Sequence, residues 1–289
     1  MRILVTGAAG QLGRDVVDEL KKRGEDPVGV DIADMDITDG AAVRATMERV
    51  RPDAVIHCAA WTAVDAAEAP ENREKVRRIN ADGTANIAAL CKELDCKMMY
   101  ISTDYVFDGE GTNPWKPDCK AYRPLSVYGQ TKLDGELAVS GLLEKYFIVR
   151  IAWVFGVHGK NFVATMLRLS ETHDTLRVVS DQIGTPTYTA DLAKLLCDMI
   201  VTDRYGYYHA TNEGGYISWA DFAGEIFRQA GKRTTVIPVT TEEYGLSAAA
   251  RPHNSRLDKS KLTEAGFARL PSWQDALHRY LIETGVIAE

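Results

Sequence analysis

Short apolar runs alternate with longer amphipathic segments along the first half of the chain. Runs of strand length cover residues 2–6, 27–31, 54–58, 97–102 and 147–153. Amphipathic segments lie between them, among them residues 12–23, 41–50, 71–94 and 126–143. Strands that alternate with helices predict βαβ units and a parallel sheet. Runs such as RILV and AVIH are apolar throughout, as expected when helices cover both faces of the sheet.

After about residue 155 the alternation becomes less regular. Helix candidates remain at residues 161–172, 189–201, 218–231 and 273–283, with short β-like runs at 176–179 and 207–210. We therefore predict an α/β protein: a doubly wound parallel sheet followed by a smaller C-terminal lobe, some of whose elements cross back to the sheet.

Composition and charge exclude several classes of protein. The chain has 289 residues, 45% of them hydrophobic, which is typical of a globular protein. The net charge of −7 argues against a broad nucleic-acid surface. The five cysteines match no zinc pattern, so we expect reduced thiols, no metal site and a cytoplasmic location. No apolar stretch has the length of a membrane span, so no membrane partner is expected.

A glycine-rich turn follows the first predicted strand. Gly7 allows a tight strand-to-helix turn, Gly10 lets the backbone approach a pyrophosphate, and Gly13 lets the helix pack close to the strand. Asp31 ends the second strand, where a carboxylate can bind adenosine ribose hydroxyls and repel a 2′-phosphate. We predict NADH or NADPH as cofactor, with NADH favoured by Asp31, although Arg14 lies near enough to keep NADPH open. Residues 1–155 then form the Rossmann dinucleotide-binding domain, and residues 156–289 the substrate-binding lobe.

A tyrosine and a lysine are spaced to share one face of a predicted helix. Tyr128 and Lys132 are four residues apart, and an ammonium near a phenol lowers the phenol's pKa. Tyr128 is therefore a candidate proton donor. The preceding strand ends in Thr103 and Asp104, at the sheet edge that holds ligands in such folds, so the Thr103 hydroxyl can bind the same substrate oxygen.

Taken together, the segments TGAAGQLG, HCAAWTAVD, STDYVFDG, YGQTK, WVFG and RPHNSRLD resemble the extended short-chain dehydrogenase/reductase family. The likeness runs from residue 1 to about residue 262. It implies reduction of a keto group on a nucleotide-sugar, with Thr103, Tyr128 and Lys132 as the catalytic triad. Lys132 and Tyr128 would also contact the cofactor, and the resemblance adds these cofactor-binding residues: Gln11, Leu12, Asp36, Ile37, Ala59, Ala60 and Thr62.

The resemblance also predicts residues that contact the substrate. Asp104 and Trp153 would face the nucleotide-sugar, with Thr103. The loop containing Arg251, Asn254 and Ser255 would bind the diphosphate, since arginine forks suit phosphate oxygens. Asn80 would support the active-site lysine. Members of the family have been associated with Mg²⁺ at a dimer contact built from three Glu, but this chain has Asp15 and Asp191 near the matching places, so we carry no Mg²⁺ over to it.

Other functions share this fold. One is a different nucleotide-sugar 4-ketoreductase or a 4-epimerase, which would use the same triad. Another is a non-catalytic subunit that resembles the regulatory subunit of methionine adenosyltransferase, because fold alone does not imply activity. The presence of Thr103, Tyr128 and Lys132 together favours the enzyme. The sequence leaves both a monomer and a homodimer open.

Overall fold

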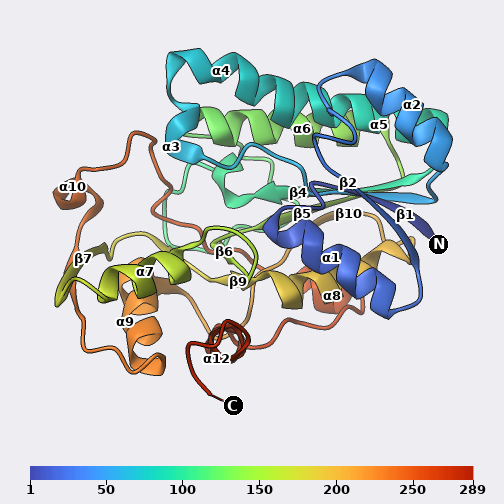
Figure 1. The fold of residues 1–289 in the computed structure, drawn as a ribbon. Coiled ribbons are helices and arrows are strands. Elements are labelled where there is room, and N and C mark those ends of the chain that lie inside the picture. The colour runs from blue at the N-terminus through green and yellow to red at the C-terminus, as the bar shows by residue number, and fades with distance from the viewer. Residues whose placement is uncertain (289) are drawn as a thin grey trace.

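A six-stranded parallel sheet forms the centre of the protein (Figure 1). The structure, a computed structural model, describes residues 1–288, so the last residue of the predicted substrate lobe lies outside it. The strand order is β10-β5-β4-β3-β1-β2, with these bounds: β1 (Arg2–Thr6), β2 (Asp26–Val30), β3 (Ala54–His57), β4 (Lys97–Thr103), β5 (Tyr146–Ile151) and β10 (Gly206–His209). The chain starts at β1, moves outward to the edge strand β2 and crosses back to β3 on the other side of β1. Ligands bind at such a reversal, at the carboxyl ends of the strands.

Helices cover both faces of the sheet, which confirms the doubly wound prediction (Figure 1). One face carries α1 (Gln11–Lys22) and α8 (Thr189–Ile200), and the other carries α2 (Gly40–Val50), α4 (Pro70–Arg77), α5 (Gly83–Glu93) and α6 (Val127–Leu142). Side chains alternate between the faces along each strand. On β1, Ile3 and Val5 pack with Leu192 of α8, whereas Leu4 packs with Val43 of α2.

The predicted elements differ from the structure at two places near the site. The segment predicted as one helix over residues 71–94 consists of α4, a π-helical turn at Arg78–Asp82, and α5. Such turns insert an extra residue and are frequent at functional sites. The strand predicted over residues 147–153 ends at Ile151, because Trp153 has a left-handed backbone with φ of 51°. The next strand, β6 (Val154–Phe155), pairs with β9 (Thr187–Tyr188) outside the main sheet.

The C-terminal half forms a second core and also returns to the sheet. Phe155, Phe222 and Tyr280 belong to this core, where α9 and α12 pack. The C-terminal half contains α7 (Phe162–Ser170), α9 (Trp219–Gln229), α10 (Thr241–Tyr244), α11 (Ser260–Glu264), α12 (Trp273–Glu283) and the paired strands β7 (Thr175–Val179) with β12 (Thr235–Val239) and β8 (Ile183–Gly184) with β11 (Ile217–Ser218). Strand β10 and helix α8 lie against the first half instead, as edge strand and covering helix. None of the helices in residues 1–288 is both long and apolar enough to span a membrane.

Candidate active site

A cavity of about 900 Å³ opens at the carboxyl ends of β1, β3, β4 and β5. All the residues predicted to bind the cofactor line it, and so do Thr103, Asp104, Trp153 and Arg251 of the predicted catalytic and substrate-binding residues. A cavity of this size is within the range of small-molecule and cofactor sites. The β1–α1 turn and the catalytic candidates thus share one space.

The glycine turn is packed so tightly that side chains cannot replace its hydrogens. Gly7 has φ of +65°, and a Cβ there would lie 2.8 Å from the Ala59 backbone nitrogen. A Cβ on Gly13 would lie 2.1 Å from the Gly7 carbonyl oxygen. Helix α1 begins directly after Gly10, and its first turn has no acidic residue. Its N-terminal amides and positive dipole end therefore suit a pyrophosphate.

Asp31 lies beside this turn at the end of β2. Its Oδ2 accepts a hydrogen bond from the Ala9 N–H at 3.0 Å, and its Oδ1 accepts one from the Ile32 N–H at 2.8 Å. The carboxylate thus fixes the glycine turn as well as placing a negative charge on the cavity wall. Asp36 lies further along the same wall, where the backbone N–H and hydroxyl of Thr38 lower its pKa.

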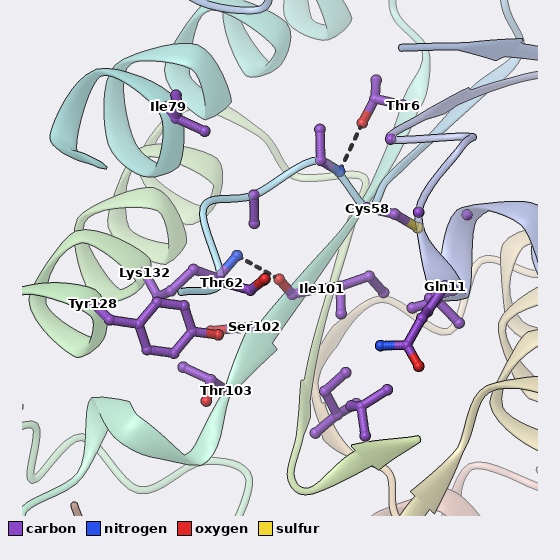
Figure 2. Close-up of a pocket in the computed structure, with 18 of the residues that line it drawn as sticks. Thr6, Gln11, Cys58, Thr62, Ile79, Ile101, Ser102, Thr103, Tyr128 and Lys132 are labelled. Atoms are coloured by element: carbon purple, nitrogen blue, oxygen red, sulfur yellow. Dashed lines mark hydrogen bonds between the residues drawn. The ribbon is translucent and has the colours of Figure 1, made fainter. Parts of the chain in front are cut away.

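Helix α6 presents Tyr128 and Lys132 toward the end of β4 (Figure 2). Ser126 caps the helix by accepting a hydrogen bond from the Gly129 N–H at 3.1 Å. A Cβ on Gly129 would lie 2.3 Å from the Tyr105 carbonyl oxygen, so the first turn of α6 packs directly on the turn that follows β4. This close packing brings Tyr128 near Thr103, whose hydroxyl acts to lower the pKa of the phenol and donates a hydrogen bond to Asp104 Oδ1 at 3.0 Å.

Lys132 is buried and directed at β4. Its Nζ donates a hydrogen bond to the Ile101 carbonyl at 2.7 Å (Figure 2). The same Nζ lies 4.1 Å from the centre of the Tyr100 ring. Burial lowers the pKa of Lys132 to about 7, while the Glu136 carboxylate acts to raise it. Glu136 is itself paired with Arg150 of β5, and both side chains are fully buried.

The expectation that the Lys132 ammonium lowers the pKa of the Tyr128 phenol is wrong for the protein without ligands. Burial raises the pKa of Tyr128 well above its ordinary value, and the group that lowers it within residues 1–288 is the Thr103 hydroxyl. Lys132 does not contribute, because its ammonium is directed to the Ile101 carbonyl and the Tyr100 ring. The phenol therefore keeps its proton at neutral pH, which suits a proton donor.

Asp104 and Trp153 line the same cavity as the glycine turn. Burial raises the pKa of Asp104 to about 6, and its Oδ2 makes no hydrogen bond to any group in residues 1–288. Trp153 stacks on Trp219 with ring centres 3.7 Å apart. Trp219 also lines the cavity. No sequence motif indicated this second tryptophan, which lies at the start of a predicted amphipathic helix.

The predicted diphosphate loop contributes only one residue to the cavity wall, Arg251. Asn254 is buried elsewhere, where its side-chain amide donates to the backbone carbonyls of Glu110 at 3.2 Å and Asn113 at 2.9 Å. The Ser255 backbone N–H donates to the Ile183 carbonyl at 2.8 Å. Direct substrate contacts of Asn254 and Ser255 stay predictions.

Asn80 lies in the π-helical turn and joins the loop after β3 to α6. Its side chain accepts a hydrogen bond from the Trp61 N–H at 2.8 Å and donates to the Thr131 hydroxyl at 3.2 Å. Residue 131 is the neighbour of Lys132, so Asn80 supports the helix segment that carries the lysine.

Asp15 and Asp191, the residues near the family's Mg²⁺ contact, have protein partners. Asp191 accepts hydrogen bonds from Arg279 at 2.9 and 2.7 Å, so its charge is matched by a guanidinium. Asp15 lies 3.6 Å from His158. Within residues 1–288, no group of three or more His, Cys, Asp or Glu side chains is arranged to hold a metal ion.

Comparison with known proteins places this geometry in a family. The model of the RmlD substrate binding domain matches residues 1–285. The chain is 42% identical to a dTDP-4-dehydrorhamnose reductase of Streptomyces griseus, over 96% of this chain and 91% of that protein. It is 40% identical to the spore coat polysaccharide biosynthesis protein SpsK of Bacillus subtilis, over 98% and 97%.

Solved structures of related proteins share the fold of this chain. A dTDP-4-dehydrorhamnose reductase of Bacillus anthracis in complex with NADP superposes with a TM-score of 0.93, at 42% identity over 98% of this chain and 99% of that one. A UDP-glucose 4-epimerase of Thermus thermophilus in complex with NAD, at 19% identity with a TM-score of 0.82 over 100% of both chains, shares the fold alone. Because the family model spans nearly the whole chain and several relatives exceed a third identity, the protein belongs to the RmlD substrate binding domain family.

Proposed function

We propose that the protein reduces the C4 keto group of dTDP-4-dehydro-L-rhamnose to give dTDP-L-rhamnose, with NADH or NADPH as the reductant. The observation that carries this proposal is the meeting of Tyr128, Thr103 and Lys132 in the cavity that also contains the glycine turn. Relatives at 34–42% identity over nearly the full chain carry the name of this reductase, which supports the choice of substrate.

The residues present fit a nicotinamide dinucleotide. The glycine turn would hold the pyrophosphate, the wall containing Asp31, Asp36 and Ile37 the adenosine, and Lys132 the nicotinamide ribose. When bound, such a cofactor supplies a hydride to the keto carbon. We assign residues 1–155 mainly to this cofactor and residues 156–289 mainly to the substrate, with β10 and α8 as structural exceptions.

Tyr128 donates the proton that the reduced oxygen requires. An alkoxide is a stronger base than a phenolate, so it takes the proton from Tyr128 even though burial keeps the phenol's pKa high. Thr103 binds the same oxygen through its hydroxyl and holds the keto group beside the phenol. Lys132 is directed at the Ile101 carbonyl, so it supports this step by holding the nicotinamide ribose rather than by lowering the pKa of the phenol.

We further propose that NADH binds more tightly than NADPH. Asp31 places a carboxylate on the adenosine side of the cavity, where a 2′-phosphate would meet a like charge. A relative has been crystallised with NADP, so the expected discrimination is modest rather than absolute. The enzyme would act in the cytoplasm on a nucleotide-sugar.

The test is oxidation of NADH or NADPH by the purified protein on addition of dTDP-4-dehydro-L-rhamnose. We expect turnover with both cofactors and a lower KM for NADH. Sugar isomerisation without net cofactor oxidation would indicate a 4-epimerase instead. Absence of turnover on any nucleotide-linked 4-keto sugar, with dinucleotide still bound, would indicate a non-catalytic subunit and contradict the proposal.

A further inference from the structure

The short helix α3 (Val64–Ala67), near the rim of the cavity, is joined to a distant part of the chain. The Asp65 Oδ1 accepts a hydrogen bond from the Ala249 backbone N–H at 3.1 Å. Its Oδ2 lies 2.5 Å from Nη2 of Arg251. The coil between α10 and α11 rises toward α3 to make these contacts (Figure 1). One carboxylate thus fixes both the backbone and the guanidinium of this coil.

Arg251 connects Asp65 with the residues around the catalytic tyrosine. Its Nη1 donates a hydrogen bond to the Tyr105 hydroxyl at 3.2 Å, and its Nε donates to Ser247 Oγ at 3.0 Å. The Tyr105 ring in turn packs edge-on against the Tyr128 ring, with centres 5.5 Å apart. A continuous path of contacts therefore runs from Asp65 through Arg251 and Tyr105 to Tyr128.

The opposite end of α3 reaches the helix that carries Tyr128. Glu68, the residue after α3, accepts a hydrogen bond from the Val127 N–H at 2.7 Å, at the first residue of α6. The segment after β3 therefore contacts both the Arg251 coil and the N-terminus of α6. Displacement of either one would disturb the other through this segment.

We propose that Asp65 is a positioning residue that holds the Arg251 guanidinium at the cavity wall to bind the diphosphate of the nucleotide-sugar, and that Arg251 steadies Tyr128 through Tyr105. A guanidinium carries more N–H donors than its contacts with Asp65, Tyr105 and Ser247 use, so donors remain for phosphate oxygens. Diphosphate binding far from the keto group then helps to orient the proton donor. Enzymes use remote binding energy in this way to raise kcat as well as to lower KM.

A purely structural role for Asp65 makes a different prediction. The side chains of Arg251 and Asp65 are 27% and 46% exposed, and pairs this exposed contribute little to folding stability. Loss of such a pair should leave KM and kcat unchanged. If the Asp65 carboxylate instead competed with the ligand for the Arg251 guanidinium, the opposite result would follow. Removal of Asp65 would then tighten the binding of an anionic ligand.

The first experiment compares Asp65→Ala and Asp65→Asn, using calorimetric titration with dTDP. We expect Asp65→Ala to weaken dTDP binding by about 5-fold, because the guanidinium loses its anchor, and Asp65→Asn to stay within about 2-fold, because its amide oxygen still accepts a hydrogen bond. The matched control is Glu93→Ala, which breaks an exposed pair with Arg44 remote from the cavity, and no change in binding is expected. Unchanged or tighter binding by Asp65→Ala would overturn the inference.

The second experiment tests the path to Tyr128 with a double-mutant cycle. Asp65→Ala should lower kcat for the keto sugar by about 5-fold in the wild-type background, but by less than about 2-fold in a Tyr105→Phe background, where the link to Arg251 is already absent. Equal reductions in both backgrounds would show that Asp65 does not act through Tyr105.

This inference rests on the proposed function only in the double-mutant cycle, which measures kcat and therefore requires turnover of the keto sugar. If the wild-type protein reduces no keto sugar, the proposed function fails, and the dTDP titration still decides whether Asp65 positions Arg251 for a diphosphate. If the wild type is active and the titration and the cycle give no effect, the positioning role alone fails.

Discussion

Replacement of Glu136 by Gln removes one charge from an ion pair that lies wholly inside the protein. Arg150 Nε and Nη2 contact the two carboxylate oxygens of Glu136 at 2.8 and 2.7 Å, and both side chains are fully buried. Gln is nearly the same size, so the change leaves the packing intact and isolates the loss of charge. The guanidinium then remains buried without a counter-ion.

The magnitude follows from this burial. Removal of one partner from a buried pair costs about 3–5 kcal/mol of folding free energy, because it leaves an uncompensated charge. Arg150 keeps hydrogen bonds to the Pro117 carbonyl and the Tyr122 hydroxyl, each at 3.1 Å, so we expect a value toward the lower end. A domain is typically stable by about 5–15 kcal/mol, and the loss is therefore a large share of the total.

The same substitution has a second effect, on the catalytic lysine. The Glu136 carboxylate acts to raise the pKa of Lys132, which burial holds at about 7. Without that charge the pKa of Lys132 falls further, and more of the lysine is neutral at neutral pH. The pH profile of turnover should therefore shift toward acid, which a simple loss of stability would not cause.

Urea denaturation followed by circular dichroism, together with the pH dependence of kcat, measures both effects. The matched control is Glu93→Gln, whose exposed pair with Arg44 joins α2 and α5, and its denaturation midpoint should stay close to that of the wild type. A loss of less than about 1 kcal/mol for Glu136→Gln would refute the view that this carboxylate compensates a buried charge.

Two further predictions concern the glycine turn and Lys132. Gly13→Ala places a Cβ 2.1 Å from the Gly7 carbonyl oxygen, so α1 must move; we expect a stability loss of about 1–3 kcal/mol and at least about 10-fold weaker dinucleotide binding, measured by denaturation and titration. Gly141→Ala in α6, where the added Cβ meets open space, is the control and should be neutral or slightly stabilising. For Lys132, the unfolded chain keeps the lysine proton up to about pH 10.5 and the folded protein only to about pH 7, so unfolding takes up a proton between these values. The contribution of Lys132 to stability should therefore rise by about 1.4 kcal/mol per pH unit above pH 7, and the stability of the wild type relative to Lys132→Met should improve from pH 7 to 9; a pH-independent difference would contradict the lowered pKa.

The sheet and the glycine turn could be predicted because their signals are local. Apolar runs such as RILV form strands that are buried on both faces, and Gly7 and Gly13 lie where a Cβ would collide with backbone. The carboxyl ends of parallel strands lie at one edge of the sheet, which is why Thr103 could be predicted to lie near the ligands. The Tyr128–Lys132 spacing was also local, since residues four apart on a helix share a face.

The remaining features depend on contacts between residues far apart in the chain. The direction of Lys132 depends on Ile101 and Tyr100, which lie on β4. The Trp153–Trp219 stack joins segments separated by more than sixty residues. No local pattern reveals that Asp65 meets Arg251. Sequence motifs therefore indicated which chemical groups gather in the cavity, and the structure was required to show how they are oriented.

The most direct test of the account is the turnover of Tyr128→Phe with dTDP-4-dehydro-L-rhamnose. This change removes the proton donor and keeps the ring that packs on Tyr105. We predict that kcat falls by about 10²-fold or more, while dinucleotide affinity changes by less than about 3-fold. Wild-type turnover by this variant would contradict the claim that the Tyr128 phenol protonates the reduced oxygen.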